Sequence, residues 1–200
     1  MRNVLVFGED YGHEVVLRTL LDRLAAEYRV PLKVQVRSAV GGHGRMIREL
    51  TAFLSELQRG QAALPDLFVV ARDANCLGYA KRVKEITAAV KEYQGFLVLA
   101  VPDPHVERWL LIDSQAFRQV LGQGCQAPDQ KCDRDRYKRL LDTAVRTAGL
   151  EPLLGGMEFA EDILSVMNLS RAERADASFA HLLGDLGNAF QRWKVRESNR

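Results

Sequence analysis

Short hydrophobic runs alternate with longer amphipathic segments through the first half of the chain. Four runs predict strands, at residues 3–7, 32–37, 67–71 and 96–101. The segments between them carry apolar side chains at helical spacing and predict helices, at residues 14–28, 45–58 and 79–93. Because strands and helices alternate, we expect βαβ units and an α/β fold with a mostly parallel sheet flanked by helices.

The pattern changes after Pro102-Asp103-Pro104. Helical patterns cover residues 105–121, 134–148, 157–167 and 177–195, and no convincing strand follows. We therefore predict an α/β core over residues 1–103 and a helical extension over residues 104–200 that packs on this core.

Composition indicates an ordinary globular protein. The chain has 200 residues, 47% hydrophobic and 27% charged, and a net charge of +2 that is too small to indicate nucleic acid by itself. With neither a signal-length nor a membrane-length apolar stretch, the expected location is the cytoplasm, without a membrane partner. Cys76, Cys125 and Cys132 form no C-x-x-C pair, so we expect reduced thiols and no structural zinc.

Carboxylates follow three of the predicted strands. Glu9 and Asp73 come directly after the first and third strands, and Glu107 follows the fourth by one short turn. The carboxyl edge of a parallel sheet is where ligands gather, and converging carboxylates favour a hard divalent cation, most often Mg²⁺. The sequence therefore predicts a metal site at this edge.

Neighbouring polar residues fit either this site or a structural role. Glu14 lies in the first helical turn, where an acid also complements the helix dipole. Asn75 could add an oxygen ligand beside Asp73, or the pair could form an Asx turn or a helix cap. Asp103 could assist the site or cap the next helix.

Histidines, glycines and basic residues give weaker signals. His13 and His105 lie near the acidic positions, although dispersed histidines are more often satisfied or exposed. The segment 41–44 could contact phosphate or simply connect two elements, and it matches neither a Walker A loop nor a dinucleotide fingerprint. A basic cluster is the best candidate for nucleic-acid contact, although nearby acids slightly favour the alternative of a solvated helix face. The cluster contains Lys131, Arg134, Arg136, Lys138 and Arg139.

These motifs resemble the TOPRIM fold of topoisomerases, bacterial primases, recombination-repair proteins and OLD-type nucleases. That pattern has a Glu after the first strand and a D-x-D after a later one, which here are Glu9 and Asp73-Ala74-Asn75. The chain is most similar to small TOPRIM-like proteins encoded beside ATPases in bacterial defence loci, through Glu14, residues 104–113 and residues 177–183. It departs from the pattern in placing Gly8 before the acid and an amide at position 75.

The resemblance implies a Mg²⁺- or Mn²⁺-dependent nuclease. In that account Glu9, Asp73 and Glu107 are catalytic and bind the metal, together with Asn75, while Glu14 and Asp103 assist. Nucleic acid, either DNA or RNA, would contact Lys131, Arg134 and Lys138. The alternative is a non-catalytic, metal-binding regulatory or effector subunit that acts with an ATPase partner. Whether the chain forms a homo-oligomer stays open.

Overall fold

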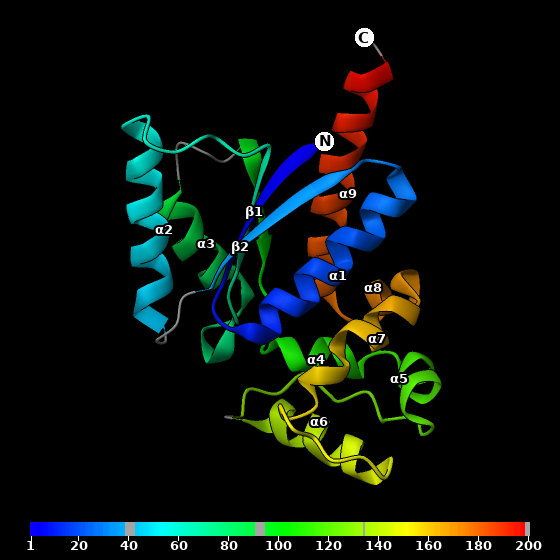
Figure 1. The fold of residues 1–200 in the computed structure, drawn as a ribbon. Coiled ribbons are helices and arrows are strands. Elements are labelled where there is room, and N and C mark those ends of the chain that lie inside the picture. Colours follow the sequence, from blue (N-terminus) through cyan, green and yellow to red (C-terminus); the bar gives the residue numbers. More distant parts are fainter. Residues whose placement is uncertain (39–42, 91–94, 134, 199–200) are drawn as a thin grey trace.

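The computed structural model describes residues 1–38, 43–90, 95–133 and 135–198 (Figure 1). Within these residues the chain forms a parallel sheet in the order β2-β1-β3-β4. The strands are β1 (Arg2–Gly8), β2 (Leu32–Ser38), β3 (Leu67–Ala71) and β4 (Leu97–Ala100). The prediction of an α/β fold with a mostly parallel sheet and a C-terminal helical region is therefore confirmed.

Hydrophobic patterning explains the place of each strand in the sheet. The last five residues of β1 and all of β3 are buried, as expected for central strands covered on both faces. β2 alternates apolar and polar residues, and its apolar side chains Leu32, Val34 and Val36 pack against the core from the sheet edge. The two central strands thus bring the segments that follow them to the middle of one sheet edge.

Helices cover both faces of the sheet (Figure 1). α2 (His43–Gln58) and α3 (Tyr79–Ala89) pack on one face around a smaller core, and α1 (Tyr11–Tyr28) and α9 (Ala177–Ser198) lie on the other. The larger core runs from β1 to Trp193, so the helical extension shares it with the sheet. The proposed boundary after Asp103 stays a prediction. No helix in the described segments is long and apolar enough to cross a membrane.

The helical extension contains more elements than its periodicity predicts. The segment expected as one helix over 105–121 is two, α4 (Val106–Leu111) and α5 (Ser114–Leu121). Further on lie α6 (Arg136–Thr147), α7 (Ala160–Val166) and α8 (Leu169–Ala175), the last of which the pattern did not predict. The chain also forms the single-turn 3₁₀ helices η1 (Asn75–Leu77) and η3 (Met157–Phe159).

The cysteine prediction is wrong for two of the three residues. Cys76 and Cys132 form a disulfide, with Cα atoms 5.3 Å apart and 56 positions between them in sequence. Sequence spacing did not reveal the pair because the fold brings the loop after β3 beside the segment before α6. Cys125 is a free thiol, and burial raises its pKa to about 11.

Asp113 organises the junction between α5 and α8. Its carboxylate accepts hydrogen bonds from the Gln115 and Ala116 amides and caps α5, which explains the helix break. The same carboxylate pairs with Arg171 Nη2 at 2.7 and 2.8 Å and accepts a bond from the Asn168 amide. One buried acid therefore joins α5 to α8 through a partner, Arg171, that lies 58 positions further along the chain.

We predict that Asp113→Ala lowers the free energy of unfolding by about 3 kcal/mol, because it removes a helix cap and leaves Arg171 without its carboxylate. This loss is at the low end of the range for breaking a buried ion pair, because the Arg171 side chain is 38% exposed. Urea denaturation measures the loss. Asp142→Ala, which breaks the exposed i,i+4 pair with Arg146, should lower the free energy of unfolding much less. Equal losses in the two variants would contradict the organising role of Asp113.

Candidate metal centre

The acidic positions meet at a topological switch point of the sheet. β1 is paired with β2 on one side and with β3 on the other, so the segments leaving β1 and β3 diverge from the same place. Ligand sites in open α/β sheets form at such points, outside the carboxyl ends of the strands. Here α1 begins after β1, and α4 begins after β4.

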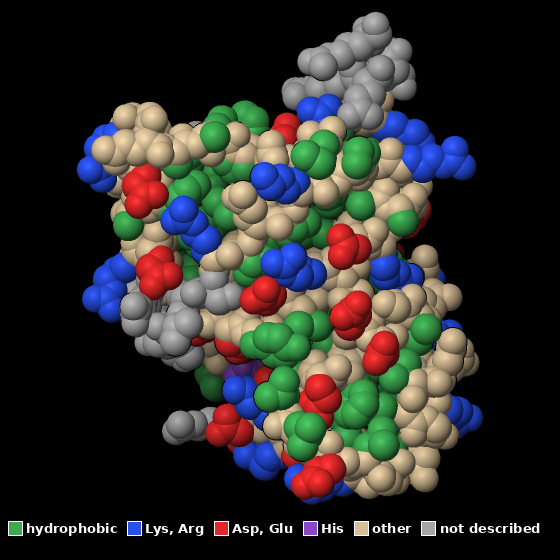
Figure 2. Space-filling view, in the orientation of Figure 1, with side chains coloured by type: hydrophobic (Ala, Val, Ile, Leu, Met, Phe, Trp, Pro, Cys, Tyr) green, Lys and Arg blue, Asp and Glu red, His purple; other side chains and the backbone are tan. Residues whose placement is uncertain are grey.

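Three side chains form a compact cluster at this edge. Asp73, His105 and Glu107 each present a ligand atom, and these atoms all lie within 4.8 Å of one another. Asp73 follows β3, whereas His105 and Glu107 come from the turn after β4 and the start of α4. Figure 2 shows histidine, acidic and basic side chains close together in the region below the sheet. Two carboxylates and one imidazole form a donor set that suits a divalent cation.

Asp73 is at the centre of the cluster. Its Oδ1 accepts a hydrogen bond from the Val106 amide at 3.0 Å and lies 3.2 Å from His13 Nε2. Its Oδ2 lies 3.1 Å from His105 Nδ1. Burial by itself would raise the pKa of Asp73, but the charge of His13 and the hydrogen bond from His105 hold it well below its usual range. Asp73 is therefore a carboxylate at neutral pH.

His13 is a buried link between two acids. Its side chain is 1% exposed, and its Nδ1 lies 2.9 Å from Oδ1 of Asp10, the residue that caps α1. Burial alone would lower the pKa of His13, but the charge of Asp73 and the hydrogen bond to Asp10 outweigh it and raise the pKa to about 10. We infer that His13 is an imidazolium at neutral pH, so it is a fixed positive charge rather than a general base.

Glu107 has the least satisfied carboxylate of the cluster. Its Oε2 is buried and has no hydrogen-bond partner in the described part of the chain, and Lys138 Nζ lies 3.9 Å from Oε1. Burial, and then the charge of Asp73, raise the pKa of Glu107. A cation between Glu107 and Asp73 would supply the missing partner and favour the ionised form. This orphaned oxygen is the strongest sign that the residues present fit a metal ion.

Arginines fix the backbone of the loop after β3. Arg82 Nε donates to the Asp73 carbonyl at 2.9 Å, and Arg82 and Arg72 both pair with Glu85. Asn75 has a positive φ of 50° and donates from Nδ2 to the same carbonyl at 3.3 Å. In an Asx turn a side-chain oxygen accepts a bond from a backbone amide two residues on, so this contact is a different one, and the role of Asn75 stays a prediction.

The cluster found among the described residues does not include the other predicted acids. Glu9 follows β1, and its Oε2 is buried. Glu14 forms an i,i+4 ion pair with Arg18 at 3.2 Å, consistent with a role at the start of the helix. The Asp103 amide donates to Ser178 Oγ at 3.2 Å, which ties the turn after β4 to α9. Their roles at the site stay predictions.

The basic cluster is only partly at the site. Lys138 reaches Glu107, whereas Lys131 is exposed and pairs with Asp129 at 2.8 Å. Arg134 lies outside the described residues, as do positions 41 and 42 of the glycine segment; His43 and Gly44 begin α2. Among the described members of the basic cluster, Lys138 therefore contacts the acidic group directly.

Two histidines that sequence reasoning treated as ordinary are central to the site. The available signal was position: His13 lies four residues after Glu9, and His105 lies two residues before Glu107. Neither spacing distinguishes a site residue from an exposed one, because the decisive contact of each histidine is with Asp73 on a different strand.

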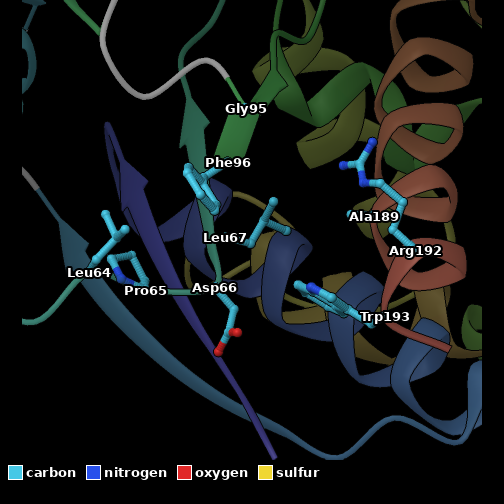
Figure 3. Close-up of a pocket in the computed structure, with 9 residues that line it drawn as sticks. All are labelled: Leu64, Pro65, Asp66, Leu67, Gly95, Phe96, Ala189, Arg192 and Trp193. Atoms are coloured by element: carbon cyan, nitrogen blue, oxygen red, sulfur yellow. The ribbon is translucent and has the colours of Figure 1, made fainter. Parts of the chain in front are cut away.

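A cavity of about 240 Å³ lies at the opposite end of the sheet, beside the beginnings of β3 and β4 and against α9 (Figure 3). Its lining residues are Leu64, Pro65, Asp66, Leu67, Gly95, Phe96, Ala189, Arg192 and Trp193. Asp66 already pairs with Arg2 at 3.3 Å. Since none of the clustered metal-ligating residues lines this cavity, it is not part of the metal centre.

Comparisons with known proteins add no assignment. The chain matches no protein-family model, no curated protein and no solved structure.

We predict that the metal-free protein loses stability on both sides of a plateau in pH. The pKa of Asp73 is lower in the folded protein than its unfolded value of 3.8, so ionised Asp73 stabilises the fold above pH 3.8. This contribution is lost as the pH falls below 3.8. The pKa of His13 is about 10 in the folded protein and 6.5 in the unfolded chain, so protonated His13 stabilises the fold fully below pH 6.5. This contribution is lost as the pH rises from 6.5 towards 10. Chemical denaturation with EDTA present, repeated across pH, measures both arms.

His13→Gln should lose about 3 kcal/mol at pH 6, because the variant leaves two acids near an uncharged side chain, and its alkaline arm should flatten. The matched control is His181→Gln, since His181 is exposed and stacks on Tyr79. An alkaline arm that is unchanged in His13→Gln would show that His13 does not carry the effect.

Proposed function

We propose that the protein is a metal-dependent hydrolase of phosphodiester bonds in nucleic acid, with a divalent cation held by Asp73, His105 and Glu107. The proposal rests on two observations: ligand atoms of the three residues lie within 4.8 Å of one another, and Glu107 has a buried oxygen, Oε2, without a hydrogen-bond partner among the described residues. A cation bound there would lower the pKa of a bound water and stabilise the leaving oxygen of the phosphodiester.

The donor set favours Mn²⁺ over Mg²⁺ among the two expected ions. Mg²⁺ prefers oxygen ligands in strict octahedral geometry, whereas imidazole suits later transition metals and Mn²⁺ accepts mixed sets more readily. His105 therefore changes the expectation from an all-oxygen site to a mixed one. The TOPRIM resemblance supports a nuclease, with the difference that one ligand is a histidine.

Basic side chains beside the cluster support a polyanionic substrate. Lys138, on α6, is 56% exposed and points its Nζ to within 3.9 Å of Glu107 Oε1. In this position Lys138 can contact a phosphate at the cluster. Lys131 and Arg139 are also exposed, but they pair with Asp129 and Asp133. These acids reduce the positive electrostatic potential around the two basic side chains. Either DNA or RNA fits these contacts, and a defence effector acting beside an ATPase fits the resemblance.

A second candidate is a metal-binding regulatory subunit that does not catalyse. Both carboxylate oxygens of Asp73 already contact protein groups, which suits a structural acid as well as a ligand. The helical extension also exposes apolar side chains that a partner such as an ATPase could cover, and Figure 2 shows hydrophobic side chains exposed in its lower part. The exposed apolar side chains of the helical extension include Leu140, Leu150, Leu153 and Leu154.

The test compares cleavage of supercoiled plasmid and of single-stranded RNA with Mn²⁺, Mg²⁺ or EDTA. We expect Mn²⁺-dependent cleavage, and we expect its rate to fall at least about 100-fold in Asp73→Asn and in Glu107→Gln. Loss of a residue that only supports the ligands of a metal site already lowers activity by up to about 100-fold, and these two residues are the proposed ligands. Both changes keep side-chain volume and remove charge. Asp142→Asn is the control, because Asp142 lies on α6 and pairs with Arg146 away from the cluster.

Calorimetric titration with Mn²⁺ separates the two candidates. Binding without cleavage of either substrate, lost in Asp73→Asn, would favour the regulatory subunit. Absence of both binding and cleavage in folded wild-type protein would contradict the proposed metal site.

A further inference from the structure

The Cys76–Cys132 disulfide lies beside the metal centre and connects two of the segments that surround it. Cys76 follows Asn75 and is three residues from Asp73, whereas Cys132 follows Lys131 in the segment before α6. Both cysteines are exposed, so a reductant can reach them. Neither residue has a part in the proposed hydrolysis.

The disulfide closes a ring of contacts around the cluster. The His105 imidazole contacts Asp73 on one side and lies 6.0 Å, centroid to centroid, from the Tyr137 ring on the other. The Tyr137 hydroxyl accepts a hydrogen bond from the Lys131 amide at 2.7 Å, next to Cys132. From Cys76 the chain returns to Asp73 through Asn75. We call this set the contact ring, and its members are Asp73, Asn75, Cys76, His105, Tyr137, Lys131 and Cys132.

The segment that carries Cys132 depends on a small number of attachments. Residues 122–133 form no helix or strand, and the hydrogen bonds near the cysteine lead towards α6, through Tyr137 and Arg136. On the other side, the Asn75 amide donates to the Pro104 carbonyl at 2.9 Å, next to His105. The disulfide is thus the covalent link between a loop that positions Asp73 and a segment that positions Tyr137 against His105.

We propose that this disulfide is a thiol–disulfide switch that regulates the metal centre, with the oxidised form holding the ligands in place for metal binding. The proposal rests on the proposed function for the nature of the site. Opening the disulfide frees the segment that carries Cys132, so this segment and the Tyr137 side chain bonded to it can shift against His105, while the bonds of Asp73 to His105 and Val106 remain. Loss of a supporting group of this kind typically lowers metal affinity by about 10- to 100-fold.

The chemical step requires a dithiol reductant and balances without another reactant. A thiolate of the reductant attacks one sulfur of the protein disulfide, and the other protein sulfur leaves as a thiolate and takes up a proton. The second thiol of the reductant then attacks the mixed disulfide and releases the second protein thiol. Two electrons pass from the dithiol to the protein, and the reductant becomes a cyclic disulfide.

The first test measures Mn²⁺ affinity by calorimetry in air-oxidised protein and in protein reduced with dithiothreitol, which is removed anaerobically before titration. We expect reduction to weaken binding by about tenfold and reoxidation to restore it. Cys125→Ser, which keeps the disulfide, should behave like wild type. The double variant Cys76→Ser/Cys132→Ser should bind weakly and show no response to reductant.

The second test needs no metal and separates failure of the switch from failure of the proposed function. Hydrogen–deuterium exchange should increase on reduction at residues 73–78, 104–107 and 129–133, while β1 and β3 stay protected. If oxidised protein binds no Mn²⁺ but this exchange still increases, the metal site fails and the redox coupling stands.

Three results would overturn the switch. The first is exchange that does not change at residues 104–107 on reduction. The second is unfolding of the whole chain on reduction, seen by circular dichroism, which would make the bond a structural staple. The third is air-oxidised protein in which all three cysteines react as free thiols.

Discussion

A buried carboxylate that must stay ionised is the constraint on which the rest of this structure depends. Asp73 is 9% exposed, and an unpaired charge at that depth would be costly. The protein surrounds it with His13, from α1, and with His105 and the Val106 amide, from the start of α4. Because these groups also hold the pKa of Asp73 low, the acid remains a charged centre around which other groups collect.

The sheet makes this arrangement possible. β1 and β3 are adjacent and parallel, so the segments carrying His13 and Asp73 leave from neighbouring positions. Asp10 caps α1 and also fixes His13, so one acid sets both the start of the helix and the orientation of the imidazole. Glu107 completes the group but is left with a buried oxygen that no described residue satisfies. An incompletely satisfied acid beside a fully ionised one is an arrangement that a cation would stabilise, and this is why we favour a metal centre over a purely structural acidic cluster.

The sequence predicted the strands and the sheet edge better than the contacts at that edge. Continuous apolar runs such as residues 67–71 identify buried parallel strands, and acids that follow such strands lie at one edge of the sheet, so Asp73 and Glu107 could be predicted. Glu9 follows β1 in the same way but is not in the cluster found among the described residues. The pairing of Cys76 with Cys132 and the role of Asp113 could not, because each depends on segments that are more than 50 residues apart. His13 was missed for the same reason: its helical position is visible in the sequence, but its contact with Asp73 depends on strand order.

The central claim is that Asp73, His105 and Glu107 hold one cation, and a crystal of the protein grown or soaked with Mn²⁺ tests it most directly. Anomalous diffraction locates Mn²⁺ independently of any assumed ligand. The account predicts an anomalous peak between these three side chains, with Glu107 Oε2 among the ligands, and no such peak in Asp73→Asn crystals. A peak elsewhere, or an ordered Asp73–His105–Glu107 group without a peak at saturating Mn²⁺, would contradict it.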